Sequence, residues 1–270
     1  MKYRIWSINC GNSMRDAAAV SDLLHLKDIS MHFGAVMALD RVDISVGRGE
    51  VLALLGDNGA GKSTLIKVIS GGLKPSGGKI FFEGEERVFE SPHDAKQMGI
   101  ETVYQDLSVC LNADVVANFF MGRELTRRVF GIPILREGEM KAITEKVLSA
   151  GGTRIRSVRI NAEHLSGGQR QAIELNRFVH WGGKLVVLDE PFAALGVEQV
   201  RRGLETIAHV RDQGITVIIV THNMTHAFEI ADRIVVMHQG RVSGNVPTAQ
   251  TTHEDVIRMI TGDAARRSAS

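Results

Sequence analysis

The sequence predicts an α/β fold with a mainly parallel sheet, a small antiparallel sheet beside it, and an inserted helical lobe. Strand-like apolar runs alternate with helix-like stretches along the chain, which is typical of parallel sheets with crossover helices. A hairpin pattern around Glu83 and Gly84, together with two earlier strand-like runs, indicates the antiparallel sheet. From about residue 107 to 159 the chain is expected to be mostly helical, and this stretch predicts the inserted lobe.

The first hundred residues predict strands on both sides of one clear helix. Residues 25–33 and 38–46 are expected strands, and 50–55 (EVLALL) is an expected buried strand. Residues 61–70 (GKSTLIKVIS) predict a helix that Gly71 and Gly72 end. Residues 78–89 predict the hairpin of the antiparallel sheet.

The later elements alternate again after the helical lobe. Within the lobe, residues 115–122 and 137–152 are the clearest helices. Strands are then expected at 184–188, 215–220 and 233–242, the last of them as a strand or a hairpin. Helices are expected at 197–214, 225–232 and 252–262.

Composition limits the class of protein. With 44% hydrophobic and 23% charged residues, the chain has the balance of an ordinary globular protein. Its net charge of +1 gives no global attraction to nucleic acid or anionic lipid. No apolar run approaches the roughly 20 residues that span a bilayer. Two cysteines provide no disulfide framework. We expect a disordered leader at residues 1–22, one domain at 23–262 and a disordered tail at 263–270.

The stretch GDNGAGKST, Gly56 to Thr64, lies between the buried strand and the first helix. It satisfies G-x-x-x-x-G-K-[ST], with Gly56, Gly61, Lys62 and Ser63 at the fixed positions. Glycines let backbone N–H groups wrap a phosphate closely, and a helix N-terminus favours an anion. Lys62 adds positive charge for the outer phosphates, and Ser63 adds an oxygen for Mg²⁺. A glycine-rich turn with an exposed lysine is the less favoured alternative.

The stretch KLVVLDEP, residues 184–191, places Asp189 and Glu190 just past an apolar strand. The carboxyl ends of strands are where α/β sheets bind ligands. Asp189 is expected to help hold Mg²⁺, and Glu190 to orient and polarise an attacking water. Taken alone, the pair could equally cap a following helix that has Pro191 at its first position.

The stretch LSGGQRQ, residues 165–171, places Ser166, Gly167 and Gly168 before an expected helix. These residues would present a hydroxyl and bare backbone N–H groups at a second positive helix end. In most soluble proteins Ser-Gly-Gly before a helix is only a flexible N-cap. Here it shares one chain with the phosphate loop and shortly precedes the carboxylate strand.

Together the three motifs resemble those of the nucleotide-binding subunit of ATP-binding cassette transporters. The resemblance extends from about Leu24 to Gly262, nearly the whole chain. It implies a P-loop NTPase core of the RecA-like type with a helical subdomain at about residues 107–176. It also implies an ATPase that uses ATP and Mg²⁺.

The resemblance assigns roles to further residues. Gln105 in VYQDL resembles the glutamine that reaches Mg²⁺, His222 in IIVTHN resembles the histidine that contacts the γ-phosphate, and Phe33 resembles the aromatic that stacks on adenine. The implied catalytic residues are Lys62, Gln105, Glu190 and His222, and the implied metal ligands are Ser63, Gln105 and Asp189. The implied nucleotide-binding residues are Phe33, Gly56, Asp57, Asn58, Gly59, Ala60, Gly61, Lys62, Ser63, Thr64, Ser166, Gly167, Gly168 and Gln169.

If the family resemblance is set aside, these residues have other interpretations that assign them no role in ATP hydrolysis. Gln105 could be an ordinary loop residue, and Phe33 a core aromatic. His222 and His226 are four residues apart and could face one way like a metal pair, but no third ligand is evident. The pairs Arg127–Arg128 and Arg201–Arg202 are expected to be solvated faces, not nucleic-acid contacts.

The family also implies partners. One phosphate loop and one signature imply two cassettes paired head to tail, most simply a homodimer, with each signature closing the other's site. Residues 193–196 (AALG) resemble the loop that touches the partner cassette. A chain without a membrane span implies separate permease subunits and, indirectly, a periplasmic substrate-binding protein. The cassette would then lie on the cytoplasmic side of the inner membrane, with no nucleic acid as partner.

The helical lobe favours a sugar as cargo. VYQDL with residues 111–124, IRSVR at 155–159, and DEPFAALGVEQ resemble the bacterial importers of ribose, xylose and fructose, in their single-cassette branch. The alternatives are another cargo such as branched amino acids or lipids, export, a soluble ATPase that acts with nucleic acid, or a regulatory module without catalysis.

Three positions depart from the family pattern. Phe192 stands where Thr or Ser is usual, Gly196 stands where many cassettes have Asp, and Asn176–Phe178 replaces small residues. We hypothesise that Phe192 alters packing beside the loop between subunits and slows turnover.

Overall fold

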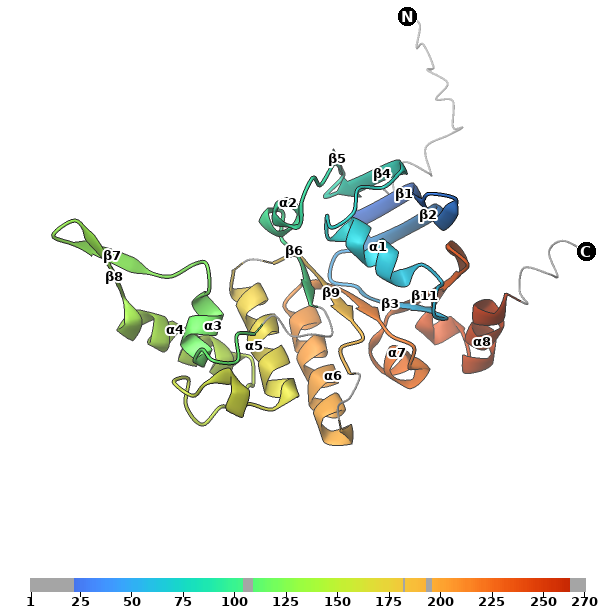
Figure 1. Cartoon of the computed structure of the whole chain (residues 1–270). Coiled ribbons are helices and arrows are strands. Elements are labelled where there is room, and N and C mark those ends of the chain that lie inside the picture. Colours follow the sequence, from blue (N-terminus) through green and yellow to red (C-terminus); the bar gives the residue numbers. More distant parts are fainter. Residues whose placement is uncertain (1–21, 104–108, 182, 193–195, 263–270) are drawn as a thin grey trace, which may run out of the picture.

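A computed structural model describes residues 22–103, 109–181, 183–192 and 196–262 (Figure 1). Its core is a six-stranded sheet with the order β12-β11-β3-β10-β9-β6. These strands are β3 (Val51–Gly56), β6 (Ile100–Val103), β9 (Leu185–Asp189), β10 (Thr216–Val220), β11 (Arg233–His238) and β12 (Arg241–Pro247). All pairings are parallel except that of β11 with β12. The mainly parallel sheet that the sequence predicts is therefore confirmed.

Both faces of the core sheet are covered, which explains why its central strands are apolar throughout. All six residues of β3 are buried. Leu52 and Leu54 pack in the cluster that contains the apolar face of α1 (Lys62–Ile69). The alternate residues of β3 pack instead with α6 (Val197–Asp212) and α7 (Met224–Ile230). Because strand side chains alternate between faces, one apolar run serves two cores and fixes the point where the phosphate loop begins.

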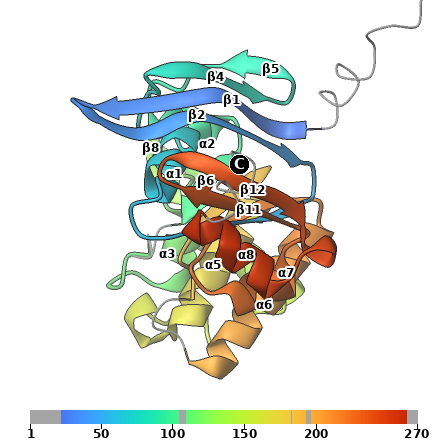
Figure 2. The same cartoon turned by 90° about the vertical axis from the view of Figure 1, so that its right-hand side faces the viewer.

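The antiparallel sheet has the order β2-β1-β4-β5 and forms a separate layer from the β11–β12 hairpin (Figure 2). Its strands are β1 (Asp22–Phe33), β2 (Val36–Gly47), β4 (Gly77–Phe82) and β5 (Glu85–Arg87). The turn between β4 and β5 lies where the sequence predicts it, and Glu83 and Gly84 have φ of 56° and 80°, as a type I′ turn requires. Asp22, the last residue of the predicted leader, already belongs to β1.

The helical lobe contains α3 (Val115–Phe120), α4 (Glu137–Ala150) and α5 (Gly167–His180) around a core of its own. Phe119 and Phe120 of α3 pack in this core with Met140 of α4 and Ile173 of α5. Helix α5 lies beside α6 and so joins the lobe to the main sheet (Figure 1). This helix continues to His180, beyond the limit of 176 expected for the helical subdomain.

The expectation of a mostly helical stretch is wrong for residues 126–135. They form an antiparallel hairpin, β7 (Thr126–Val129) and β8 (Ile132–Leu135), that protrudes from the lobe (Figure 1). The reason is local, because β-branched residues favour strands and Pro133 disfavours a helix interior. Phe130 and Gly131 have φ of 50° and 82° and close the turn.

The remaining elements are short or peripheral. They are α2 (Pro92–Gln97), η2 (Ala162–His164), η3 (Thr248–Gln250) and α8 (His253–Thr261). Helix α8 begins with a capping box of Thr252 and Asp255 and ends at Gly262, whose φ is 77°. Among the described residues, no helix has the length and apolar character needed to cross a bilayer.

Candidate functional site

The loop Gly56–Thr64 leaves the carboxyl end of β3 and enters α1. Two of its glycines are required because a side chain there would clash with the neighbouring backbone. A Cβ on Gly56 would lie 2.4 Å from the Met237 carbonyl oxygen, and one on Gly61 would lie 2.7 Å from the Ala38 carbonyl oxygen. Gly61 also has φ of 102°, where a side chain is strained. The loop is thus held against β11 and β2 in a conformation that suits glycine.

The first turn of α1 is arranged to receive an anion. Gly61 stands at the N-cap and makes no side-chain cap, so the first N–H groups of the helix keep their outward direction. Ser63 lies exposed in this turn, and Asp57, Asn58 and Gly59 are exposed in the loop before it. A phosphate at this position would meet backbone donors and a hydroxyl together.

Lys62 brings a positive charge over the loop. Its Nζ donates to the carbonyl oxygens of Gly56, at 2.6 Å, and of Asp57, at 3.0 Å. Burial lowers the pKa of Lys62, while the charges of Glu190, Asp189 and Asp57 act in the opposite direction. The lysine therefore interacts with both predicted carboxylates, and loop and carboxylate strand form one site.

Asp189 is the last residue of β9, next to β10 and at the same edge of the sheet as the loop. Burial raises the pKa of Asp189, and the charge of Glu190 adds to this, whereas Lys62 and Lys67 lower it. Residues 190–192 form a turn, so Pro191 begins no helix there and the helix-capping alternative is wrong. The pair instead lies at the sheet edge, where α/β folds bind ligands.

Glu190 has a strained backbone and a fixed side chain. Its φ is 47°, and its N–H donates to the Val220 carbonyl oxygen at 2.8 Å. Its Oε1 lies 2.8 Å from Nδ1 of His222, which precedes α7. An ionised carboxylate only accepts, so Nδ1 carries the proton and Nε2 is the ring atom available to a ligand. The glutamate side chain is 23% exposed and the histidine 74%.

Phe33 ends β1 and is 48% exposed. Val36 and Met37, at the start of β2, are also largely exposed and extend the apolar surface. The next residue, Ala38, contacts the loop at Gly61, so this apolar surface lies beside the first turn of α1. It offers a face for a flat aromatic ring. Val36 and Met37 are not predicted from the sequence, where their only signal is an apolar pair after the Gly34 turn.

Ser166 caps α5 with a reciprocal pair of hydrogen bonds. Its Oγ accepts from the Gln169 N–H at 3.3 Å, and the Oε1 of Gln169 accepts from the Ser166 N–H at 3.0 Å. The Nε2 of Gln169 also donates to the Arg154 carbonyl oxygen at 3.0 Å. A Cβ on Gly168 would meet nothing within 4 Å, so packing inside this chain does not require a glycine there.

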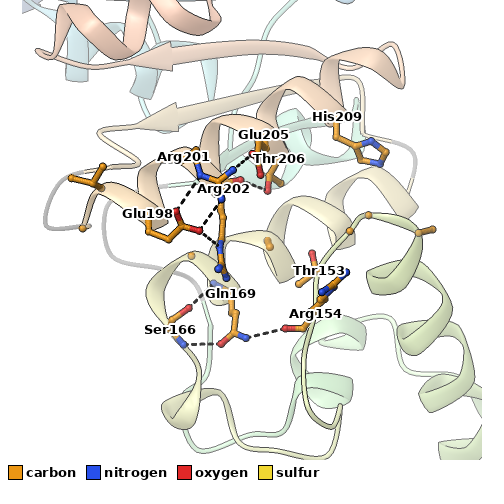
Figure 3. A pocket seen from close by; sticks show the side chains of 17 residues that line it. Thr153, Arg154, Ser166, Gln169, Glu198, Arg201, Arg202, Glu205, Thr206 and His209 are labelled. Carbon is orange, nitrogen blue, oxygen red and sulfur yellow. Dashed lines mark hydrogen bonds and ion pairs between the residues drawn. The ribbon is translucent and has the colours of Figure 1, made fainter.

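The signature residues open onto a groove of about 1110 Å³ between the ends of α4 and α5 and the start of α6 (Figure 3). Its lining includes Ser166, Gly168 and Gln169 but no residue of the phosphate loop. On the α6 side, the guanidinium groups of Arg201 and then Arg202 lower the pKa of Glu198 to about 2. The signature therefore lies apart from the phosphate loop of its own chain.

Comparison with known proteins decides the family. The family model described as ABC transporter matches residues 39–193, which include the phosphate loop, the signature and the carboxylate strand. The chain is 42% identical to the xylose/arabinose import ATP-binding protein of Sulfolobus acidocaldarius, over 91% of this chain and 96% of that protein. It is 40% identical to the fructose import ATP-binding protein of Rhizobium meliloti, over 90% and 95%. The chain belongs to the ABC transporter family.

Solved cassettes share the fold of this one. A nucleotide-free ATP-binding cassette from an ABC transporter matches with a TM-score of 0.75 at 27% identity, over 89% of this chain and 95% of that one. CbiO1 from Clostridium perfringens matches with a TM-score of 0.74 at 26% identity, over 91% and 97%. The predicted fold class is thus confirmed, and as a family member the cassette binds and hydrolyses ATP.

The cassette brings most predicted site residues together. Lys62, Asp189, Glu190 and His222 meet at one edge of the core sheet, with Ser63 on the adjoining helix. Ser166 to Gln169 lie apart, in the groove. Gln105 and residues 193–195 of the predicted partner loop lie outside the described residues.

The oxygen atoms of this site fit a magnesium ion. Ser63 offers a hydroxyl and Asp189 a carboxylate, which are the hard donors that Mg²⁺ prefers. A nearby cation would favour the ionised form of Asp189, against the effect of its burial. In the described ranges no group of three or more His, Cys, Asp or Glu could hold a metal by itself. The ion would therefore also need oxygens from the nucleotide.

The packing around Phe192 explains how the fold accommodates this departure from the family pattern. Its ring is buried and meets the His226 ring edge to face, with centroids 5.2 Å apart at 86°. A Cβ on Gly203 of α6 would lie 2.5 Å from Phe192 Cε1, so Gly203 makes room for the large ring. Phe192 thereby joins the Glu190 turn to α6 and α7. Phe192 stands out in the sequence, but its contacts with His226 and Gly203 could not be predicted from it.

Proposed function

We propose that this cassette is the ATP-hydrolysing subunit of a sugar importer and that it drives separate permease subunits. The observation that carries the proposal is its similarity, at 42% and 40% identity and over nearly their full lengths, to two sugar import ATP-binding proteins. The ribose import ATP-binding protein of Yersinia pestis is 33% identical, but the match covers only 46% of that longer protein. The chain thus spans nearly the full length of the first two relatives and about half the length of the third.

The residues of this chain have distinct parts in hydrolysis. Backbone N–H groups of Gly56–Thr64 and the ammonium of Lys62 bind the phosphates, and Phe33 stacks on adenine. Glu190 would orient and polarise the attacking water, and His222 holds the Glu190 carboxylate through Nδ1, which leaves its Nε2 available to the γ-phosphate. Mg²⁺, held by Ser63, Asp189 and Gln105, would neutralise charge on the phosphates.

Two cassettes are needed to complete each site. The signature lies in a groove that contains none of the phosphate loop, so one copy does not bring the two together. Gly168 has open space around its α-carbon, which suits close approach by a nucleotide on another copy. Loop and signature from different copies would enclose ATP between two positive helix ends. Closure with ATP and opening after hydrolysis would then move the permease.

The remaining partners follow from the transport proposal. The cassette would bind permease subunits on the cytoplasmic side of the inner membrane, and a periplasmic binding protein would deliver the sugar. Nucleic acid has no part in this function.

Uptake by cells tests the proposal directly. Cells that lack this chain should lose uptake of labelled xylose, arabinose, ribose or fructose, and the wild-type chain should restore it. Glu190→Gln should not restore uptake, although it should keep ATP binding, because it lacks the carboxylate that polarises water. If the wild-type chain restores uptake of a branched amino acid and of none of these sugars, the sugar assignment is wrong.

A further inference from the structure

The β7–β8 hairpin exposes four large apolar side chains. Phe130 at its tip is 102% exposed, and Ile132 is 65% exposed. Ile134 and Leu135 are 43% and 46% exposed. Large apolar side chains gathered on one protruding element mark an interaction site. The helical lobe keeps a core of its own, which does not include the hairpin.

The tip residue is disfavoured in two ways at once. Phe130 has φ of 50°, a left-handed conformation that is uncommon for a bulky residue. Asn or Asp is the usual residue at this position of a two-residue turn. A strained backbone that presents a fully exposed aromatic ring is typical of a functional contact.

The two faces of the hairpin indicate what surrounds it. In the observed register Arg127 lies opposite Ile134, Arg128 opposite Pro133, and Val129 opposite Ile132. Opposed residues share a face, so Val129 and Ile132 share one face with Arg127 and Ile134. The other face carries Thr126 and Arg128 with Pro133 and Leu135. Each face therefore combines apolar side chains with one arginine, whereas a hairpin laid on a protein surface needs only one apolar face.

Charge is arranged in tiers along the hairpin. Phe130 and the pair Val129–Ile132 form an apolar tip, and Arg128 and then Arg127 follow toward the lobe. Residues 126–135 contain no acidic side chain. An apolar end with arginines one tier behind it matches a lipid interface, where rings enter the acyl boundary and guanidinium groups stay with phosphates. The chain's net charge is only +1, so this attraction is local.

We propose that the β7–β8 hairpin inserts its tip into an anionic lipid surface, with Arg127 and Arg128 binding lipid phosphates. The inference rests on the proposed attachment of the cassette to a membrane. It assigns the hairpin a lipid contact that is separate from any contact with the permease. Two copies in one dimer would present two hairpins and bind more tightly than one.

Vesicle binding without permease or nucleotide tests this proposal. The purified chain should sediment with phosphatidylcholine vesicles that contain about one quarter phosphatidylglycerol, and less with phosphatidylcholine alone, because part of the attraction is electrostatic. Phe130→Ser and the double variant Arg127→Gln/Arg128→Gln should each weaken binding about tenfold. The double variant Arg201→Gln/Arg202→Gln removes the same charge from α6 and should bind like the wild type.

A fluorescent tip gives a second, direct readout. Phe130→Trp should show a blue shift in emission when anionic vesicles are added, because the indole leaves water. Val88→Trp places the same probe at an exposed apolar position outside the hairpin and should show no shift.

Three results would overturn the proposal. They are equal vesicle binding by Phe130→Ser and the wild type, no binding to anionic vesicles at all, and Phe130-dependent binding only when permease is present. The last result would instead assign the hairpin to a protein partner. None of the three bears on sugar uptake or ATP hydrolysis, so failure of this proposal and failure of the proposed function are distinguishable.

Discussion

Glu190 has a backbone conformation that costs energy, and its surroundings hold it in that conformation. Its left-handed backbone is fixed by the hydrogen bond to Val220, and its carboxylate by the bond to His222. Phe192, two residues on, packs against His226 of α7, four residues after His222. The proposed catalytic pair is thus positioned from both sides by contacts that short sequence motifs do not record.

His222→Ala should slow ATP turnover about a hundredfold, because removing a group that orients a general base costs roughly this much. ATP binding should change little, since the phosphate loop and Lys62 remain. Steady-state hydrolysis and nucleotide titration measure the two effects. His93→Ala removes an exposed histidine of α2 and serves as the control. Equal rates for both variants would contradict the assigned role.

Phe192→Thr should increase turnover while it lowers the free energy of unfolding by about 2–4 kcal/mol, as large-to-small core changes do. The reason is that the ring restrains the Glu190 turn against α6 and α7. ATPase rates with the permease present, together with urea unfolding, measure both quantities. Phe178→Thr is matched in size and burial, over Gly183, and should lose stability without a rate increase. An unchanged rate for Phe192→Thr would remove the hypothesis.

Asp189 predicts a pH dependence with a defined sign. Because the pKa of Asp189 is raised by burial, folding favours the protonated form. This stabilising contribution is complete below the unfolded pKa of about 3.9 and is lost as pH rises through the higher folded pKa. Without nucleotide, Asp189→Asn should therefore increase the free energy of unfolding at neutral pH.

Asp255→Asn is the matched control, and its expected change in stability has the opposite sign. The hydrogen bond from Thr252 lowers the pKa of Asp255, so its ionised form stabilises the fold above the unfolded pKa. Asp255→Asn should reduce stability at neutral pH. Urea unfolding of both variants at acid and neutral pH measures the difference. A loss of stability in Asp189→Asn would show that its burial is not the dominant effect.

Two helices begin with the same device but have different surroundings. Helices α5 and α8 both start with a capping box, built by Ser166 with Gln169 and by Thr252 with Asp255. Only the α5 box lines the large groove. The contribution of a capping box to stability can therefore be measured apart from its proposed role in ATP hydrolysis, by comparing these two helices.

Ser166→Ala and Thr252→Ala should each cost about 1 kcal/mol of unfolding free energy, because each removes one N-cap. Only Ser166→Ala should also weaken ATP-dependent pairing and hydrolysis, since its hydroxyl is proposed to face the partner's nucleotide. Thermal unfolding and ATPase rates measure the two effects. Equal ATPase rates in both variants would reduce Ser166 to a helix cap.

The elements that the sequence predicts well have strong local patterns. Strand β3 and helix α1 follow from an apolar run and a glycine–lysine loop. The β7–β8 hairpin was missed because Phe-Gly is an unusual pair for its turn and its strands have no buried face. The phosphate-loop, carboxylate and signature residues follow from motifs, whereas Phe33, Gln105 and His222 follow only from the family resemblance. The room that Gly203 makes for Phe192 and the contact of Ala38 with Gly61 depend on distant segments.

At the scale of the whole molecule, the phosphate loop and the signature lie in different parts of the fold. The loop lies at the edge of the core sheet, and the signature lies in the groove between α5 and α6. In the proposed function a single copy carries two half-sites, and a second copy of the chain completes each of them.

Mixing two inactive variants tests this claim most directly. Lys62→Ala disables the loop, and Gly168→Asp adds a carboxylate at the signature, where a Cβ meets nothing within 4 Å. Each alone should be inactive. Their equal mixture should recover up to about a quarter of wild-type hydrolysis, because half of random pairs are mixed and each mixed pair has one intact site of two. A mixture as inactive as its components would contradict the claim.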